Sequence, residues 1–205
     1  MSAGCATCAP PDRPIIDPAY KRVLWCALGI NALMGTWATL GSILAGSVAL
    51  NAEAFDFLAD AFAYGVTLWA AGKSLRWRAT SALIKAALMA GFSGFLLWRV
   101  IHSILSGQLP TPETMGLFAS VALAANVITS VMLYKYRTGD SNMRAVWLCS
   151  RNDALNDIAV LLAALGVYLT QQPWPDWLTG LLLVLLNVRS VGTVVRQARQ
   201  ELKQA

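Results

Sequence analysis

Three carboxylates, Glu53, Asp56 and Asp60, lie close together in a strongly apolar stretch of the chain. A second acidic pair with the same four-residue spacing occurs at Asp153 and Asp157. Residues four apart lie on one face of an α-helix, so each aspartate pair can present both carboxylates in one direction. A carboxylate inside a bilayer costs at least a few kcal/mol unless it is paired, protonated or bound to a cation. The two pairs therefore predict a functional site.

The stretches around these acids are long enough to cross a membrane. The 205-residue chain is 57% hydrophobic and 13% charged, with a mean hydropathy of +0.53, which is too apolar for an ordinary soluble domain. Six apolar runs can each cross a hydrocarbon core of about 30 Å as a helix. They span residues 23–45, 47–72, 80–105, 114–134, 143–170 and 177–195. We therefore expect an all-α, polytopic membrane protein with six transmembrane helices.

The connections between these runs differ in charge. Lys and Arg occur at 1–22, 73–78, 135–140 and 196–205, whereas the other three connections contain none. The positive-inside rule then places both termini in the cytoplasm. We expect a flexible cytoplasmic tail at 1–22, a six-helix transmembrane domain at 23–195 and a short cytoplasmic helix end at 196–205, in the lipid bilayer of a bacterial cytoplasmic (inner) membrane. The net charge of +5 is divided among these clusters, which does not indicate nucleic-acid binding.

In this orientation the second and fifth helices are antiparallel. At 1.5 Å per residue, Asp56 and Asp60 lie about 15–20 Å below the outer end of the second helix. Asp157 and Asp153 lie about 20–25 Å below the outer end of the fifth. The four can thus meet near the membrane centre and enclose a divalent cation with oxygen ligands. Protons compete with metal for the same oxygens, as a proton-coupled exporter working by alternating access requires.

Two motifs resemble those of the cation diffusion facilitator family. Residues 46–60, Gly-Ser-Val-Ala-Leu-Asn-Ala-Glu-Ala-Phe-Asp-Phe-Leu-Ala-Asp, resemble its second span, in which Gly-Ser-x-Ala-Leu leads into a (His/Asp)-x-x-x-Asp metal pair. Residues 152–157, Asn-Asp-Ala-Leu-Asn-Asp, resemble the fifth-span counterpart, and the resemblance covers about residues 21–199. It implies a homodimeric transporter that exchanges zinc, cadmium, manganese or iron, commonly for protons, without an organic cofactor. By motif, the ligands of its tetrahedral site are Asp56, Asp60, Asp153 and Asp157.

Two features depart from the family pattern. Neither pair contains histidine, and an all-oxygen ligand set favours manganese or iron, with zinc and cadmium remaining open. The sequence also stops after the sixth run, so we expect a short member that lacks the family's cytoplasmic C-terminal domain. Any dimer contacts must then lie in the membrane. The third run has small residues four apart that can form a packing seam or a dimer seam: Ala82, Ala86, Ala90 and Gly94.

Other candidate ligands are weaker. Cys5-x-x-Cys8 in the N-terminal tail is either an accessory capture site for soft metals such as zinc or cadmium, or has no function. Glu53 is one turn from Asp56 and is either a ligand where metal enters or leaves, or a polar neighbour of the ligands. The remaining cysteines are expected to be small buried residues of the helices: Cys26 and Cys149.

Three alternatives remain. The aspartates can form structural salt bridges, for example with Lys85 or Arg151. The chain can be a membrane-embedded magnesium-dependent phosphotransferase, although its acidic pairs are far apart in sequence and no glycine-rich phosphate cradle accompanies them. It can also be a non-transporting scaffold, which leaves the aspartates without a purpose. We therefore predict a transporter and not an enzyme. Three asparagines either line its pathway or form interhelical hydrogen bonds: Asn126, Asn152 and Asn156.

Overall fold

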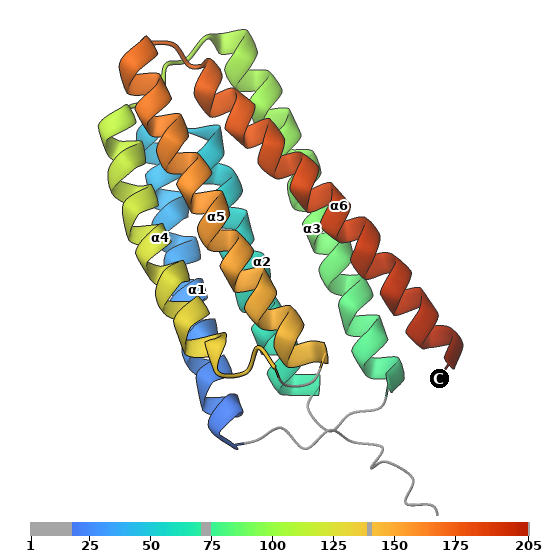
Figure 1. The fold of residues 1–205 in the computed structure, drawn as a ribbon. Coiled ribbons are helices and arrows are strands. Elements are labelled where there is room, and N and C mark those ends of the chain that lie inside the picture. The colour runs from blue at the N-terminus through green and yellow to red at the C-terminus, as the bar shows by residue number, and fades with distance from the viewer. Residues whose placement is uncertain (1–17, 71–74, 139–140, 205) are drawn as a thin grey trace, which may run out of the picture.

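The structure, a computed structural model, describes residues 18–70, 75–138 and 141–204 of the chain. All of its regular elements in those ranges are helices: α1 (Pro18–Ala45), α2 (Val48–Ala70), α3 (Leu75–Ser106), α4 (Pro112–Tyr134), α5 (Ser141–Thr170) and α6 (Trp174–Gln204) (Figure 1). Within the described residues, five of these helices are long and apolar enough to cross a membrane. The exception is α2, whose apolar sequence contains three carboxylates. The predicted all-α membrane fold is confirmed.

Five helices, α1, α3, α4, α5 and α6, extend beyond their predicted runs, and the extensions of α1 and α6 change the predicted domain bounds. The first begins at Pro18 rather than at residue 23, so residues 18–22, which we assigned to the tail, are helical. Proline is well suited to a first helical position because its missing N–H is not needed there. The last helix begins at Trp174 and continues to Gln204, so the predicted end segment prolongs α6. The rest of the predicted flexible tail, with Cys5 and Cys8, lies outside the described residues.

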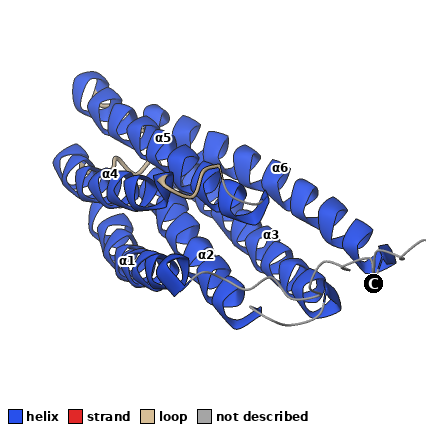
Figure 2. Ribbon diagram, turned by 60° about the horizontal axis from the view of Figure 1, so that its bottom comes forward, coloured by secondary structure: helices blue, strands red, loops and turns tan. Residues whose placement is uncertain are grey.

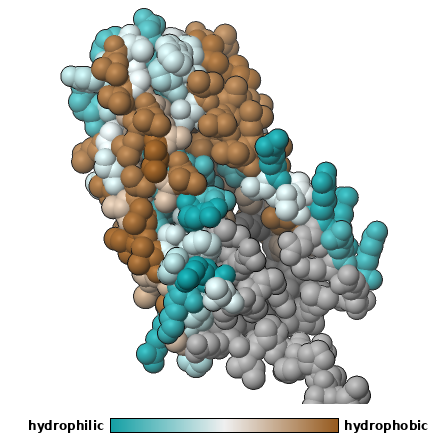
Figure 3. All heavy atoms as spheres, viewed as in Figure 1, coloured by the Kyte–Doolittle hydropathy of each residue, from teal (hydrophilic) through white to brown (hydrophobic). Residues whose placement is uncertain are grey.

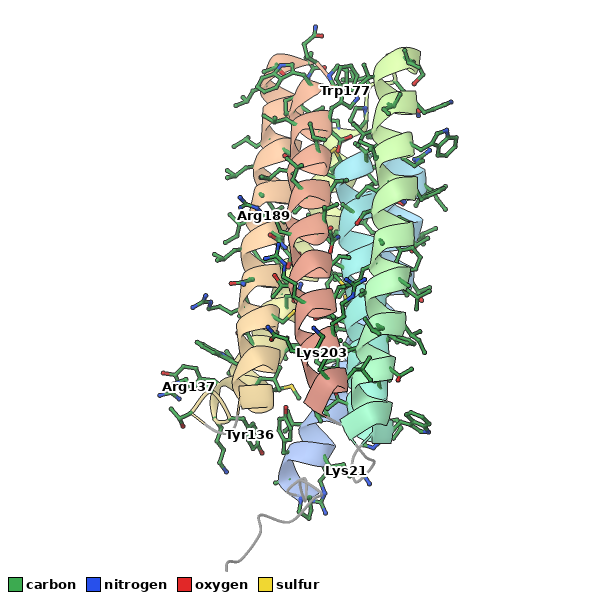
Figure 4. The ribbon with its side chains drawn as sticks, turned by 90° about the vertical axis from the view of Figure 1, so that its right-hand side faces the viewer. Lys21, Tyr136, Arg137, Trp177, Arg189 and Lys203 are labelled. Carbon is green, nitrogen blue, oxygen red and sulfur yellow. The ribbon has the colours of Figure 1, made fainter. Side chains whose placement is uncertain are left out.

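The two ends of the bundle differ in composition. Lys21, Arg137 and Lys203 lie at the end where α1 begins and α6 finishes, which we call the basic end (Figure 4). Trp177 lies at the other end, which we call the opposite end, and Arg189 lies between the two (Figure 4). The links between α1 and α2, α3 and α4, and α5 and α6 all lie at the opposite end, and none of them contains Lys or Arg.

The helices divide into a group of four and a pair. Helices α1, α2, α4 and α5 pack together, and α3 and α6 lie side by side next to α2 and α5 (Figure 2). All six contribute to one hydrophobic cluster in the half of the bundle near the opposite end. A second cluster, nearer the basic end, takes its buried residues from α1, α2 and α4. The α3–α6 pair is therefore joined to the other helices mainly in the opposite half, and it leans away from them toward the basic end (Figure 1).

Small residues allow tight packing at the opposite end. Gly41 of α1 faces Phe118 of α4 so closely that a Cβ at position 41 would overlap the phenyl ring. The same ring stacks on Trp37 with 4.4 Å between centroids. Gly46 has φ +67°, a left-handed conformation that glycine adopts without steric cost, and this permits the short turn from α1 into α2. The opposite half is thus a closely packed apolar layer.

The surface agrees with a membrane environment. Figure 3 shows hydrophobic atoms over most of the upper part of this face, with hydrophilic atoms at the tip and again in the lower part. Many large apolar side chains are exposed along the helices, including Leu33, Val131 and Leu162. Such a surface suits lipid, because a soluble protein rarely exposes continuous apolar patches of this extent.

Candidate metal centre

One pocket at mid-height of the bundle contains all four predicted aspartates. It lies where α2 faces α5, and α1, α4 and α6 complete its walls. Its lining residues are Asn31, Glu53, Asp56, Phe57, Asp60, Asn126, Asp153, Asn156, Asp157, Val160 and Leu183. The structure therefore brings together two acidic pairs that are about a hundred residues apart in sequence, and adds Glu53 to them.

The antiparallel helices arrange the carboxylates in matched levels. Nearer the basic end, the Asp60 and Asp153 carboxyl groups are within hydrogen-bonding reach of each other. Nearer the opposite end, Glu53 and Asp157 form the same kind of contact. Asp56 lies between the two levels, close enough to act electrostatically on both Glu53 and Asp153. Five acidic groups thus form a short column along the α2–α5 interface.

Neutral donors orient some of these oxygens. Asn126 Nδ2 on α4 donates to Asp157 Oδ2 at 2.9 Å. Asn156 Nδ2 donates to Asp56 Oδ2 at a longer 3.4 Å. The two expectations for these asparagines are therefore compatible, because both side chains line the pocket and bridge helices.

Tyr64, a buried residue one turn beyond Asp60, also contributes a donor. Its hydroxyl donates to Asp60 Oδ2 at 3.4 Å. Asn31, which sequence reasoning did not select, lines the pocket from α1 and donates to the Ala27 carbonyl at 2.8 Å. An asparagine in an otherwise apolar helix was the available signal for this residue.

Several carboxylate oxygens have no donor. Both Oε atoms of Glu53 and Oδ2 of Asp153 are buried and accept no hydrogen bond from the described protein groups. Buried polar atoms are nearly always paired, and like charges repel at this spacing. A positive charge or protons must therefore accompany these acids, and the oxygen-rich donor set suits a divalent cation.

The column is exposed at one end only. Glu53 is 4% exposed and Asp157 2%, whereas Asp60 and Asp153, which are nearer the basic end, are half-buried. Beyond Asp157, the residues of the same α5 face are packed in the apolar layer, as at Val160. Access to the carboxylates therefore comes from the basic end, and the opposite end is closed.

A carboxylate on α6 fixes that closed end. Asp176 is fully buried and accepts three hydrogen bonds at the start of α2. Its oxygens receive the Ser47 hydroxyl at 2.6 Å, the Val48 N–H at 2.9 Å and the Ala49 N–H at 3.0 Å. A negative charge is favourable at a helix N-terminus, where N–H groups have no partner within the helix. Sequence reasoning placed Asp176 in a loop and missed this contact.

The cysteines of the helices and the basic residues that could pair with the aspartates were also subjects of prediction. Cys26 and Cys149 were expected to be buried, and this is wrong, because both are exposed. Cys149 lies one turn before Asp153 on the same face of α5 and so is nearer the basic end, where the column of carboxylates is exposed. Arg151 donates to Asn152 at 3.2 Å and lies over the Trp147 ring. The Lys85 side chain lies outside what the structure describes.

Comparison with known proteins shows which family and which relatives this chain resembles in sequence. The family model described as the cation efflux transmembrane domain matches residues 24–202. The zinc transporter ZitB of Yersinia pestis is 26% identical over 199 residues, covering 91% of this chain and 64% of the relative. ZitB of Escherichia coli (strain K12) is 26% identical over 202 residues, covering 91% and 63%. The magnetosome protein MamB of Paramagnetospirillum magneticum is 26% identical over 165 residues, covering 71% and 54%. The chain thus spans less than two thirds of the length of each of these relatives.

Proposed function

Because this chain belongs to the cation efflux family, we propose that it exports a divalent metal cation across a bacterial cytoplasmic membrane in exchange for protons. The observation that carries the proposal is that Asp56 and Asp60 of α2 and Asp153 and Asp157 of α5 line the same pocket. These four aspartates are the proposed ligands of the transported ion. Glu53 is proposed as an accessory ligand on the closed side of the site.

Electrostatics support a divalent ion. Two unit negative charges 4 Å apart repel by about 1 kcal/mol in water and by about 4 kcal/mol at an effective dielectric constant of 20. With five acids around one pocket, several such repulsions add, and an ion of charge +2 opposes them with an attraction to each carboxylate. Oxygen ligands from two helices also satisfy the coordination that such ions need.

The relatives support zinc as the first candidate cargo. The two ZitB relatives are named zinc transporters. The four aspartates alone favour manganese or iron, because those ions accept an all-oxygen ligand set more readily than zinc does. Manganese, iron and cadmium therefore stay in the proposal as alternative cargoes, to be compared with zinc in the same assay.

Proton exchange follows from competition for the carboxylates. If the basic end faces the cytoplasm, as the positive-inside rule predicts, the described conformation opens to the compartment from which metal is removed. Metal binding there displaces protons from the acids. Opening of the opposite end then requires α6 to part from α2 at Asp176, and protons that enter from outside release the metal.

We include a homodimer in the proposal. The resemblance to cation diffusion facilitators implies one, and α3 leaves Ala90 and Gly94 exposed on its surface, where a second copy could approach closely. Ala86, from the same predicted seam, is instead buried within the chain. Counting subunits by single-molecule photobleaching in lipid nanodiscs tests this part, and a single bleaching step in most particles would contradict it.

The competing functions have less support. A phosphotransferase needs groups that hold phosphate beside its metal, and the pocket lining contains carboxylates, amides and apolar side chains. The matched family is one of cation efflux domains, and the ZitB relatives are transporters by name. A transporter that is not an enzyme is therefore the function we infer.

Zinc flux in liposomes tests the proposal. Purified protein is reconstituted with a zinc-sensitive dye inside, external zinc is added, and the interior is made either acidic or equal in pH to the outside. An acidic interior should accelerate zinc uptake, and Asp60→Asn and Asp157→Asn should each reduce uptake to the rate of empty liposomes. Glu113→Gln is the matched control, because Glu113 is an exposed acid at the start of α4 and does not line the pocket. Uptake that ignores the pH gradient, or that survives both aspartate substitutions, would refute the proposal.

A further inference from the structure

Cys149 lies beside the carboxylates at the open end of the column. Its Sγ is 3.7 Å from Oδ1 of Asp60, with the thiol as donor. Among the described residues, Asp60, Cys149 and Asp153 can each offer one ligand atom such that all three atoms lie within 4.8 Å of one another. A sulfur ligand is therefore available next to the oxygen ligands.

These distances suit a soft divalent ion. Zinc binds thiolate sulfur at about 2.3 Å and carboxylate oxygen at about 2.0–2.2 Å, so two ligand atoms on one tetrahedral zinc lie at most about 3.7 Å apart. Small side-chain adjustments would bring the three atoms within that limit. Cys149 is exposed, which leaves room for such an adjustment.

An independent observation points to a missing ligand partner at this level. Oδ2 of Asp153 is buried and receives no hydrogen bond from the described protein groups. The Asp60 carboxylate next to it is contacted by the thiol and by the Tyr64 hydroxyl, which are both weak or distant donors at 3.7 Å and 3.4 Å. A cation between these side chains would neutralise the buried Asp153 oxygen and would have the sulfur within reach as a further ligand.

We infer that Asp60, Cys149 and Asp153 form a mixed sulfur and oxygen subsite at the basic-end mouth of the column, which selects zinc and cadmium over manganese and iron. The inference rests on the proposed function, and it adds a ligand beyond the four aspartates. On binding, the thiol releases its proton to solvent and the thiolate bonds the metal. Thiolate ligands favour zinc and cadmium over manganese, so the subsite counteracts the preference of an all-oxygen set.

The position of Cys149 gives the subsite its place in transport. It is one turn closer to the basic end than Asp153, on the accessible side of the pocket. An ion that enters from the basic end therefore meets the thiol together with the first carboxylates, before it reaches the buried Glu53 and Asp157 level. The choice between metals is therefore made at the mouth, and the inner level can bind the ion through oxygen ligands alone.

Cobalt spectroscopy on single-cysteine variants tests the subsite. The chain has four cysteines, so full-length protein can be prepared with Cys149 alone or, as the matched control, with exposed Cys26 alone, the others being replaced by serine. Purified in detergent and titrated with Co²⁺, the Cys149-only protein should show a thiolate-to-cobalt charge-transfer band. The Cys26-only protein should bind Co²⁺ through its carboxylates without this band.

Affinities provide the second readout. Cys149→Ser should weaken Cd²⁺ binding by about tenfold or more and change Mn²⁺ binding by less than about twofold, since only the soft ion gains from sulfur. If Co²⁺ binds to the Cys149-only protein without the band, or if Cd²⁺ and Mn²⁺ weaken equally, the mixed subsite is wrong while the proposed function stands. If no variant and not even the unaltered protein binds Co²⁺, the proposed function fails as well.

Discussion

Asparagine at position 176 should destabilise the protein although it is nearly isosteric with aspartate. Asp176 accepts three hydrogen bonds, from the Ser47 hydroxyl and from the N–H groups of Val48 and Ala49, in a fully buried position. An amide has one accepting oxygen, and its NH₂ group faces donors, so at least one of these bonds is lost. A hydrogen bond to a charged group contributes about 1.5–3 kcal/mol, and the lost charge at a helix N-terminus adds about 0.3–1 kcal/mol. Asp176→Asn should therefore lower the free energy of unfolding by about 2–4 kcal/mol.

Equilibrium unfolding in mixed micelles, with increasing dodecyl sulfate and followed by tryptophan fluorescence, measures this loss. Glu113→Gln is a matched control, because Glu113 is also an acid in the first turn of a helix but is exposed, and its substitution should cost less than about 0.5 kcal/mol. Ser47→Ala removes one of the three donors and should fall between the two. If Asp176→Asn and Glu113→Gln are equally mild, Asp176 does not hold the start of α2 and the described closure of the opposite end is wrong.

Three further predictions follow from the packing and the pocket. Asn126→Ala removes the hydrogen bond of 2.9 Å to Asp157 and should weaken zinc binding by about tenfold in a competitive dye titration. An unchanged zinc affinity would show that the Asn126 amide does not orient the Asp157 carboxylate. Gly41→Ala places a methyl group against the Phe118 ring and should lower the free energy of unfolding by about 1–3 kcal/mol in the same assay. Gly29→Ala is the control, because nothing lies within 4 Å of a Cβ at position 29, and it should be neutral or stabilising. Equal losses for the two variants would argue against close packing between Gly41 and Phe118. Zinc affinity should fall as the pH is lowered, because protons compete for the carboxylates, and a pH-independent affinity in isothermal titration calorimetry would exclude that competition.

The sequence was sufficient to predict the helices and the meeting of the acidic pairs. Hydropathy defined the six runs, because a spanning helix must be apolar over most of its length. Charge in the links then made the second and fifth helices antiparallel, and the rise per residue placed Asp56, Asp60, Asp153 and Asp157 at overlapping depth. Their arrangement around one pocket agrees with that reasoning, whereas their role as ligands remains a prediction.

The features that the sequence analysis missed depend on tertiary contacts or on a signal that was not used. Nothing local indicates that Asp176 caps α2, since its partners are more than a hundred residues earlier in the chain. The facing of Glu53 and Asp157 depends on the rotation of α2 and α5 about their axes, which depth alone does not fix. For Cys149 a local signal existed, because 149, 153 and 157 are successive positions on one helix face.

The central claim is that the aspartates of α2 and α5 hold the transported ion. Its most direct test is a structure of the full chain in lipid with Cd²⁺, with data collected at a wavelength that gives anomalous scattering from cadmium. The account predicts an anomalous peak within ligand distance of Asp56, Asp60, Asp153 and Asp157, and its loss in Asp60→Asn. Strong cadmium peaks only outside this pocket, or a peak unchanged by the substitution, would contradict it.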